Sequence, residues 1–462
     1  MKKWTSIFIA MTLMIILIGC SNGKVEESKM EPKLLKVLVN WDEDNFYRDY
    51  ASYFTIQNQN IEFEVITLEQ LREKRYDAYD TDEEFDFDKE FKLFVEEHQP
   101  DVFMVDDNEY YTLAEENRLY DLSILIEQSE FDIENMDTNV IQYLTKKGNG
   151  TLYGLASEFY SNALYYNKDL FAEYNVPLPT DQMSWDDIIE RAAMFPSTDD
   201  EDAIYGFEKA WGDLFGLISG MAETYGLSYV DPDAMEVTMD TEAWNKVFET
   251  AINAYQSGAV YLPDEKTEEE NEATGDIYYE SQEKFTLGKS AMIISGVWYM
   301  DYIDNSGYSD SDPINYDIVT VPVDPMHPEK GGSMNISNVF AINAQSEHID
   351  AAWEFIQFVN GDTLAKATGK STYELLTRKE HMDAPNHINI DAFYKLAPLD
   401  DTLYDSYDKL PSTFLSEFES ILTEEIASIQ KNEKTIEEAL QSIQSRADEA
   451  MQKAIAEKDD LS

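Results

Sequence analysis

The stretch PDVFMVDD (residues 100–107) contains four consecutive apolar residues, Val102 to Val105, followed by two aspartates. An apolar run of this length, bounded by a proline region and by acidic residues, predicts a strand that is buried on both faces. Two similar runs precede it, LLKVLVNW (34–41) and IEFEVITL (61–68), and segments with helical spacing of apolar residues lie between the runs. Strands that alternate with helices predict βαβ units and a mainly parallel sheet.

Helical periodicity continues along the rest of the chain. Apolar residues recur at helical spacing over residues 83–98, between the second and third runs, and in three later segments, which are residues 184–195, 346–361 and 413–457. In the first of these later segments, Ser184 stands at the N-cap position and Asp187 follows three residues later. The last segment is long enough for two amphipathic helices, and Thr435 with Glu438 forms a capping-box pattern where the second helix begins.

The first twenty residues have the layout of an export signal. Lys2 and Lys3 supply positive charge, residues 7–18 form a nearly continuous apolar run, and Gly19 and Cys20 follow. This order is typical of a secretory signal peptide, and the run is shorter than the roughly 20 apolar residues that a membrane-spanning helix needs. Cys20 is the only cysteine in the chain, so it cannot form an intramolecular disulfide.

The tetrapeptide Leu17-Ile18-Gly19-Cys20 resembles a bacterial lipobox. The resemblance implies that a signal peptide of residues 1–19 is removed and that Cys20 becomes the lipidated N-terminus. Residues 20–33 would then form a polar tether to a domain held at the extracellular face of the cell membrane. The alternative is an ordinary signal peptide with an incidental cysteine near its cleavage site.

The chain is strongly acidic. It has 93 Asp and Glu against 34 Lys and Arg, a formal net charge of −59. Such a charge repels phosphate backbones, so we expect no nucleic-acid partner. Because the carboxylates are spread along the whole chain, we interpret the acidity as an adaptation of the entire surface. The alternative interpretation is that the acidity attracts a cationic solute.

Several common catalytic patterns are absent from the sequence. There is no HExxH, GxSxG or phosphate-loop motif, and no two of the five histidines are spaced i,i+4. Pairs of carboxylates could indicate a glycoside hydrolase, but with 93 acidic residues such pairs arise by chance. We therefore expect a protein that is not an enzyme and that has no metal site and no cofactor.

Four stretches, in order, resemble the extracellular solute-binding proteins of ABC importers, in the maltose-binding-protein-like family that mostly binds sugars. They are PDVFMVDDNEYYTLAEENRLYDLSILI (100–126), LYGLASEFYSNALYYNKDLFAEYNVPLPTDQMSWDDII (152–189), FTLGKSAMIISGVWYM (285–300) and KGGSMNISNVFAINAQSEHIDAAWEFIQFV (330–359). The chain departs from the family pattern at Ala156, where proline is usual, and at Ser184, where threonine is usual.

The resemblance implies a fold of two α/β lobes with a ligand cleft and a hinge between them. It implies a monomer that captures a small solute, most often a sugar or oligosaccharide, and delivers it to the membrane permease of an ABC transporter. The expected boundaries are residues 34–160 for the first part of lobe 1, 161–331 for lobe 2, 332–375 for the return to lobe 1, and 376–462 for a C-terminal helical part that packs mainly on lobe 2.

Candidate ligand contacts come from two sources. Asn40, Trp41 and Asp42 follow the first predicted strand, and Asp106 and Asp107 follow the third, where α/β sheets bind ligands. The resemblance adds contact positions in the crossing segments and in the second lobe, which are Tyr160, Trp211, Trp298, Tyr299 and Asn335.

Two other interpretations remain open. The same fold could bind a cationic or peptide solute, because aspartates follow two of the predicted strands. A protein of another class, a surface glycoside hydrolase or adhesin, is the third possibility. A hydrolase would release products from an oligosaccharide, whereas a binding protein would leave the sugar intact.

Overall fold

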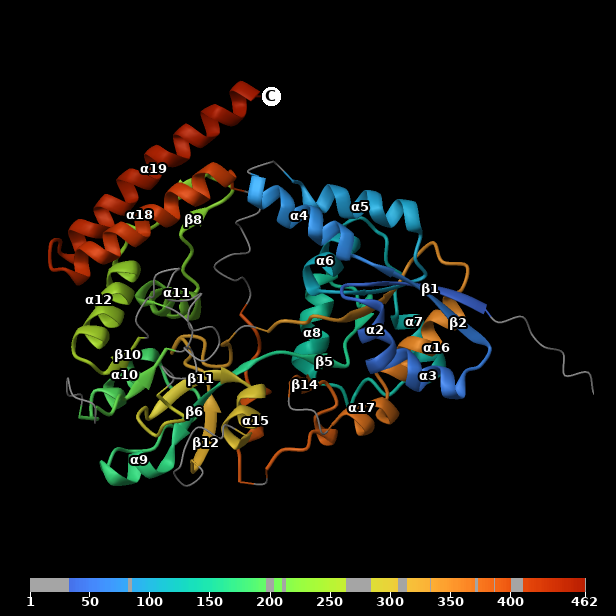
Figure 1. The fold of residues 1–462 in the computed structure, drawn as a ribbon, viewed down its shortest axis with the longest axis horizontal. Coiled ribbons are helices and arrows are strands. Elements are labelled where there is room, and N and C mark those ends of the chain that lie inside the picture. Colours follow the sequence, from blue (N-terminus) through green and yellow to red (C-terminus); the bar gives the residue numbers. More distant parts are fainter. Residues whose placement is uncertain are drawn as a thin grey trace, which may run out of the picture.

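The computed structural model describes residues 33–81, 85–196, 203–209, 213–262, 284–305, 314–332, 334–369, 373–385, 387–399 and 410–461. The predicted signal peptide and Cys20 lie outside these residues, and so does Trp211. Among the described helices, none is both long enough and apolar enough to span a bilayer. Two five-stranded sheets organise the chain into two bodies that lie side by side, called lobe 1 and lobe 2 below (Figure 1). The predicted two-lobe α/β fold is thereby confirmed.

The sheet of lobe 1 has the strand order β2-β1-β3-β13-β4. Its strands are β1 (Lys33–Val39), β2 (Ile61–Thr67), β3 (Val102–Val105), β4 (Gly154–Leu155) and β13 (Val339–Ile342). The first three run parallel, as the sequence predicts, and β13 runs antiparallel to β3 and β4. Val102 packs into one apolar cluster and Phe103 into another, so both faces of β3 are covered.

Helices surround the sheet of lobe 1. They are α2 (Glu43–Phe46), the π-helical turn η1 (Tyr47–Ala51), α3 (Ser52–Gln57), α4 (Glu69–Thr81), α5 (Phe87–His98), α6 (Asp107–Glu115), α7 (Ser123–Ser129), α8 (Thr138–Lys147), α16 (Ile349–Val359) and α17 (Asp362–Thr368). Aromatic packing joins α3 and α16 over one face, because the Phe54 ring lies 5.2 Å from the Phe355 ring. The helix predicted from residue 83 begins at Phe87, because the Asp86 side chain caps it by accepting from the Lys89 amide.

The sheet of lobe 2 has the strand order β10-β7-β11-β6-β12. Its strands are β6 (Asn162–Asn167), β7 (Phe207–Glu208), β10 (Val260–Tyr261), β11 (Met292–Gly296) and β12 (Tyr316–Thr320), and a separate ribbon pairs β8 (Val230–Asp231) with β9 (Glu236–Val237). The helices of this lobe are α9 (Lys168–Glu173), α10 (Trp185–Ala192), α11 (Leu214–Thr224), α12 (Glu242–Gln256) and α15 (Trp298–Asn305). The predicted capping box of Ser184 and Asp187 begins α10.

A helical hairpin ends the described chain. It consists of α18 (Ser412–Gln430) and α19 (Ile436–Leu461), which confirms the two helices predicted for this segment. Thr435 and Glu438 form the predicted capping box at the start of α19. The buried side chains of the hairpin, among them Phe414 and Phe418, share one apolar cluster with α11 and α12, and Figure 1 shows the hairpin lying against lobe 2.

The chain changes lobe between β4 and β6, between β12 and β13, and between β14 (Leu375–Leu376) and α18. These crossing segments are tied to one another. In the first crossing, β5 (Glu158–Phe159) pairs with β14, and Tyr160 forms an isolated bridge with Asn335 of the second crossing. A small hydrogen-bonded junction therefore joins the segments that connect the two lobes.

Candidate ligand-binding site

The carboxyl ends of β1 and β3 lie at the same edge of the lobe 1 sheet, because the two strands are parallel neighbours. Asn40 follows β1, and its backbone amide donates to the Met104 carbonyl of β3 over 3.1 Å. The Asn40 side chain is buried, and its Nδ2 donates to the Ser337 carbonyl over 3.2 Å. Because Ser337 belongs to the second crossing segment, Asn40 links this sheet edge to the junction between the lobes.

Arg72 of α4 contacts several side chains at this edge. Its Nη2 donates to Asn40 Oδ1 over 2.7 Å and to Glu109 Oε1 over 2.9 Å. The same nitrogen lies 3.7 Å from Asp106 Oδ2. The guanidinium carbon lies 5.8 Å from the centre of the Trp41 ring. Neither Arg72 nor Glu109 was predicted from the sequence, although a basic residue soon after the end of β2 was an available signal.

Asp106 and Glu109 form a capping box at the start of α6. Asp106 Oδ1 accepts from the backbone amides of Asn108 and Glu109, and Glu109 Oε2 accepts from the Asp106 amide over 3.1 Å. Burial and the neighbouring Asp106 raise the pKa of Glu109 to about 9, and the attraction of Arg72 does not reverse this. Arg72 Nη2 is shared between the two carboxyl groups and lies closer to Glu109 than to Asp106.

The two other predicted aspartates also have partners inside the protein. Asp42 is the N-cap of α2, and its Oδ1 accepts from the Asn45 amide over 2.9 Å. Asp107 is 5% exposed and accepts a hydrogen bond from the Tyr143 hydroxyl, with Lys147 Nζ 3.8 Å away. Burial raises the pKa of Asp107, while Tyr143 and Lys147 oppose that shift. The carboxylates that follow β1 and β3 are thus engaged in helix capping and internal pairing.

Tyr160 and Trp298 come together from the first crossing and from lobe 2. Trp298 is the first residue of α15, just after β11, and its Nε1 donates to the Tyr160 hydroxyl over 3.1 Å. The Tyr160 ring lies against Gly296, where an added Cβ would sit 2.7 Å from the ring carbon Cζ. Gly296 is therefore required for this close approach. Asn335 exchanges backbone hydrogen bonds with Tyr160, and its side chain is exposed.

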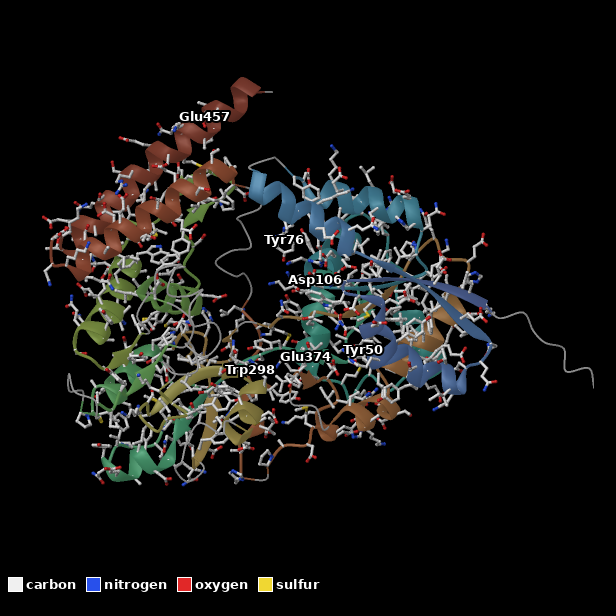
Figure 2. All side chains as sticks on the ribbon, in the orientation of Figure 1. Tyr50, Tyr76, Asp106, Trp298, Glu374 and Glu457 are labelled. Carbon is white, nitrogen blue, oxygen red and sulfur yellow. The ribbon has the colours of Figure 1, made fainter. Side chains whose placement is uncertain are left out.

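The predicted contact residues differ in how much of each side chain is exposed. Trp41 is 54% exposed and Trp298 is partly buried, whereas Tyr299 is 2% exposed. The Tyr299 ring packs edge-on against Tyr165 and stacks on Tyr302 in the apolar core. The Tyr299 side chain is therefore part of the apolar core in this structure. Figure 2 shows Asp106 in lobe 1 and Trp298 in lobe 2, on the sides of the lobes that face each other.

A pair of carboxyl groups at the junction was not predicted. Glu158 pairs with Leu376 in the β5–β14 ladder, which places Glu374 diagonally opposite Glu158 on the same face. Burial and the adjacent Glu374 raise the pKa of Glu158 well above its ordinary value. Tyr50 is 5% exposed, and burial followed by the charges of Glu158 and Glu374 raises the pKa of its hydroxyl. Figure 2 places Tyr50 and Glu374 near the junction.

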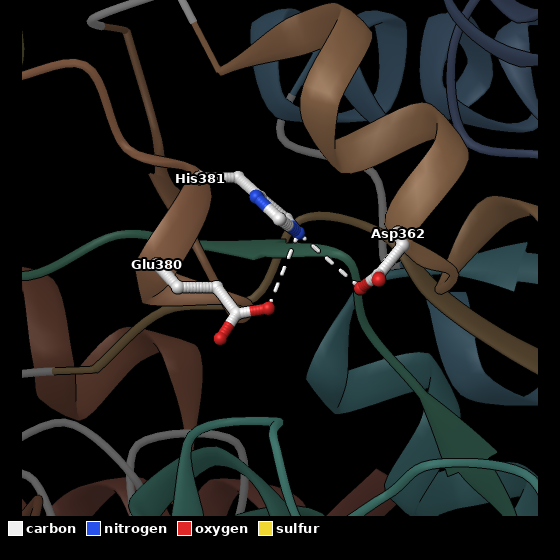
Figure 3. Close-up of side chains that lie close together, drawn as sticks. All are labelled: Asp362, Glu380 and His381. Carbon is white, nitrogen blue, oxygen red and sulfur yellow. Dashed lines mark hydrogen bonds and ion pairs between the residues drawn. The ribbon is translucent and has the colours of Figure 1, made fainter.

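One side-chain group among the described residues has the composition of a metal site. His381 Nε2 lies 3.2 Å from Asp362 Oδ1 and 3.3 Å from Glu380 Oε1 (Figure 3). Arg378 Nη1, however, lies 3.5 Å from the same Asp362 oxygen. The guanidinium already supplies positive charge to that carboxylate, and Asp362 and Glu380 are exposed. We assign no metal to this group.

The sequence matches the family of bacterial extracellular solute-binding proteins over residues 75–366, which is more than half of the chain. The protein belongs to this family, whose members bind solutes outside the cell. No curated protein sequence matches this chain significantly.

Solved structures share the fold over nearly their whole length. The sugar-binding protein MalE of Xanthomonas citri superposes with a TM-score of 0.61 at 17% identity, covering 91% of this chain and 98% of that one. A family 1 solute-binding protein of Alicyclobacillus acidocaldarius gives 0.62 at 14% identity, with 91% and 99% covered. An ABC substrate-binding protein of Listeria monocytogenes in complex with cycloalternan gives 0.56 at 19% identity, with 91% and 99% covered.

Proposed function

We propose that the solute is an uncharged carbohydrate, an oligosaccharide held between the two lobes. One observation carries this proposal. At the edge of the lobe 1 sheet, Asp106 and Asp107 lie beside basic side chains and the exposed Asp42 caps α2, while the Trp41 ring is exposed beside them. An exposed aromatic ring can stack on the apolar face of a sugar, and nearby amide groups can hydrogen-bond its hydroxyls.

The contact set proposed for this site is Trp41 from lobe 1, Tyr160 and Asn335 from the crossing segments, and Trp298 from lobe 2. The tryptophans come from different lobes, so closure about the junction would bring both rings onto one ligand. Structural neighbours support a carbohydrate: among them are a cycloalternan complex, a maltose-bound MalE3 of Thermotoga maritima and an acarbose complex of a Streptomyces glaucescens receptor.

A cationic solute is the second candidate, and a separate observation favours it. The carboxyl groups of Glu158 and Glu374 lie together at the junction, close to Tyr50. An ammonium group of the solute could pair with these carboxyl groups. We rank this candidate second because the pair lies on β5 and β14 rather than beside Trp41 or Trp298.

A thermal-shift screen with maltose, acarbose, cycloalternan and spermidine tests both candidates. A true ligand at a hundredfold excess over its dissociation constant should stabilise the protein by about 2.7 kcal/mol. We expect stabilisation by an oligosaccharide, and chromatography should recover that sugar intact. Stabilisation by spermidine alone would contradict the carbohydrate proposal, and released sugar fragments would indicate a hydrolase.

We further propose that the protein is a monomeric lipoprotein at the extracellular face of the cell membrane, where it delivers its solute to an ABC permease. The support is the lipobox-like sequence that ends at Cys20. Cys20→Ser should abolish incorporation of labelled palmitate and release the protein from membranes or leave its signal uncleaved. Normal processing and normal membrane retention of the Cys20→Ser protein would contradict lipidation.

A further inference from the structure

Arg72 contacts three parts of lobe 1 that are distant in sequence. It donates to Asn40 after β1 and to Glu109 in α6, and its guanidinium lies 5.8 Å from the Trp41 ring and 5.8 Å from the Phe87 ring. Its Nε is buried and has no hydrogen-bond partner. The guanidinium is thus held through Nη2 and through its contacts with two aromatic rings, and not through Nε.

The Asn40 amide is held at both ends. Its Oδ1 accepts from Arg72 over 2.7 Å, and its Nδ2 donates to the Ser337 carbonyl over 3.2 Å. These two hydrogen bonds distinguish the oxygen from the nitrogen, so the orientation of the amide is set. Without Arg72, the amide would lose the donor to its oxygen and could rotate.

The Trp41 ring needs support of another kind. With 54% of its surface exposed, the residue has little packing around it to hold one orientation. The Arg72 guanidinium beside the ring supplies a cation–π contact, and Asp106 and Glu109 in turn fix the guanidinium. A binding ring held in one orientation before the solute arrives loses less entropy when the solute binds.

We propose that Arg72 is a positioning residue of the ligand-binding site, which holds the Trp41 ring in the orientation that receives the solute, while the buried Asn40 amide anchors the Arg72 guanidinium. The proposal rests on the carbohydrate-binding function proposed above. The competing explanation is that Arg72 only stabilises lobe 1, in which case Trp41 would keep its orientation without Arg72.

The first test needs no solute. Acrylamide quenching of Trp41 fluorescence is measured in wild type, Arg72→Met and Arg75→Met, each as the difference from the same protein carrying Trp41→Phe. Arg75 is the matched control, because it lies on the same helix and its guanidinium packs 5.5 Å from the Phe87 ring. We expect stronger quenching and faster depolarisation of Trp41 in Arg72→Met only. Equal quenching in all three proteins would overturn the proposal.

The second test measures binding of maltose, acarbose and cycloalternan by calorimetry. Arg72→Met should bind the accepted sugar about tenfold more weakly, because a Trp41 ring that is free to rotate must be ordered when the sugar binds. In the Trp41→Ala background the same change should have a much smaller effect, because the ring it positions is gone. Equal losses in both backgrounds would show that Arg72 acts independently of Trp41.

Two further outcomes separate the positioning role of Arg72 from the proposed carbohydrate binding. If Arg72→Met does not fold, Arg72→Lys replaces it, since lysine keeps the charge beside Asp106 but lacks the planar fork that lies beside the ring. If wild type binds none of the three sugars, the proposed function fails. The quenching experiment still decides whether Arg72 positions Trp41.

Discussion

Trp298 is the lobe 2 residue of the proposed contact set, and its substitution tests that set. Its ring is partly buried, packs 6.2 Å from Tyr302 and donates to the Tyr160 hydroxyl. Trp298→Ala should weaken binding of the accepted sugar by more than about tenfold, as expected for an aromatic anchor. Because the ring is not fully buried, the ligand-free protein should lose less than the about 3–5 kcal/mol typical of a core tryptophan. Calorimetric titration and urea unfolding measure the two quantities.

Trp244→Phe is the matched control for this prediction. Trp244 is 1% exposed in the core of lobe 2, and its Nε1 donates to the Ser228 carbonyl over 3.2 Å. The control should lower the free energy of unfolding and leave sugar affinity unchanged. If Trp298→Ala instead behaved like this control, Trp298 would be a core residue and the proposed site would be misplaced at that position.

The raised pKa of Glu109 predicts that the free energy of unfolding depends on pH. Its pKa is raised from 4.5 to about 9 in the folded protein, so between these values the native state holds a proton that the unfolded state has lost. The contribution of Glu109 to stability is therefore full below pH 4.5 and falls as the pH rises toward 9, by at most about 1.4 kcal/mol per pH unit. Glutamine cannot ionise, so the Glu109→Gln protein should lack this pH-dependent change in stability.

The measurement is urea unfolding of wild type and Glu109→Gln between about pH 5 and pH 8.5. The free energy of unfolding of wild type, minus that of the variant, should decrease steadily across this range. Because Glu158 titrates in both proteins, its effect cancels in the difference. A difference that stays constant with pH would show that Glu109 has an ordinary pKa and is ionised beside Arg72.

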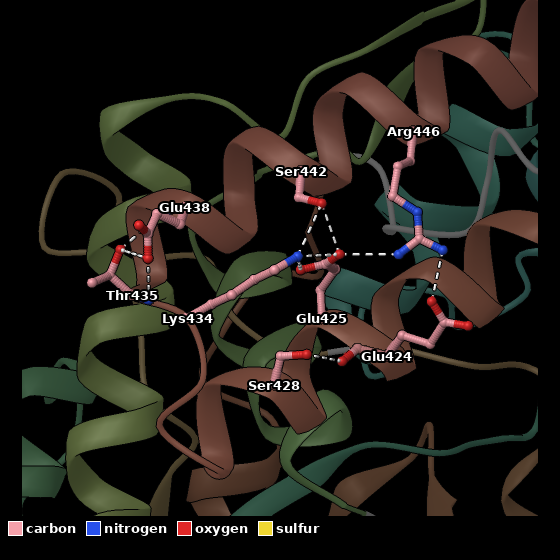
Figure 4. Close-up of polar contacts among 8 residues, drawn as sticks. All are labelled: Glu424, Glu425, Ser428, Lys434, Thr435, Glu438, Ser442 and Arg446. Carbon is pink, nitrogen blue, oxygen red and sulfur yellow. Dashed lines mark hydrogen bonds and ion pairs between the residues drawn. The ribbon is translucent and has the colours of Figure 1, made fainter.

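At the scale of elements, a buried charge fixes the α18–α19 hairpin (Figure 4). Glu425 of α18 is 1% exposed, and its carboxylate accepts from Lys434 at 2.6 Å, Ser442 at 2.7 Å and Arg446 at 3.0 Å. Burial alone would raise the pKa of Glu425, but these hydrogen bonds lower it below its ordinary value. The apolar faces of the two helices set their contact, and this network sets their register.

Glu425→Ala should lower the free energy of unfolding by about 2–3 kcal/mol, because three donors lose a charged acceptor in a buried position. Glu424→Ala is the matched control. Glu424 pairs with Arg446 on the outside of the hairpin, where its side chain is 60% exposed, so the control should change stability by no more than about 1 kcal/mol. Equal effects in urea unfolding would show that the buried network contributes no more than the surface ion pair.

At the scale of the whole molecule, the net charge of −59 predicts how binding responds to salt. We interpret this charge as a property of the surface as a whole. Exposed charges are screened beyond about 8 Å at physiological ionic strength, and an uncharged solute gains nothing from the field. Raising NaCl from about 0.05 M to about 0.5 M should leave the affinity for the accepted sugar nearly unchanged. A steep fall in affinity with salt would support a cationic solute.

Features encoded over a few neighbouring residues could be predicted from the sequence. The parallel strands β1, β2 and β3 follow from apolar runs, and the capping boxes at Ser184 and Thr435 follow from residues three apart. Hydrogen bonds of this kind close within one turn of helix, so no tertiary contact is needed to specify them. The order of the four stretches that resemble the solute-binding family likewise indicated that family and its two lobes.

The site needed the tertiary structure, because its contacts join residues far apart in sequence. Arg72 reaches Asn40 and Glu109 across 32 and 37 positions, and Trp298 reaches Tyr160 across 138. The aspartates after β1 and β3 could serve a solute or the protein itself, and only the tertiary structure brings Tyr143 and Lys147 to Asp107. Sequence determined which residues stand at the strand ends. Folding decided which of them remain exposed, because burial and pairing depend on the elements packed around each side chain.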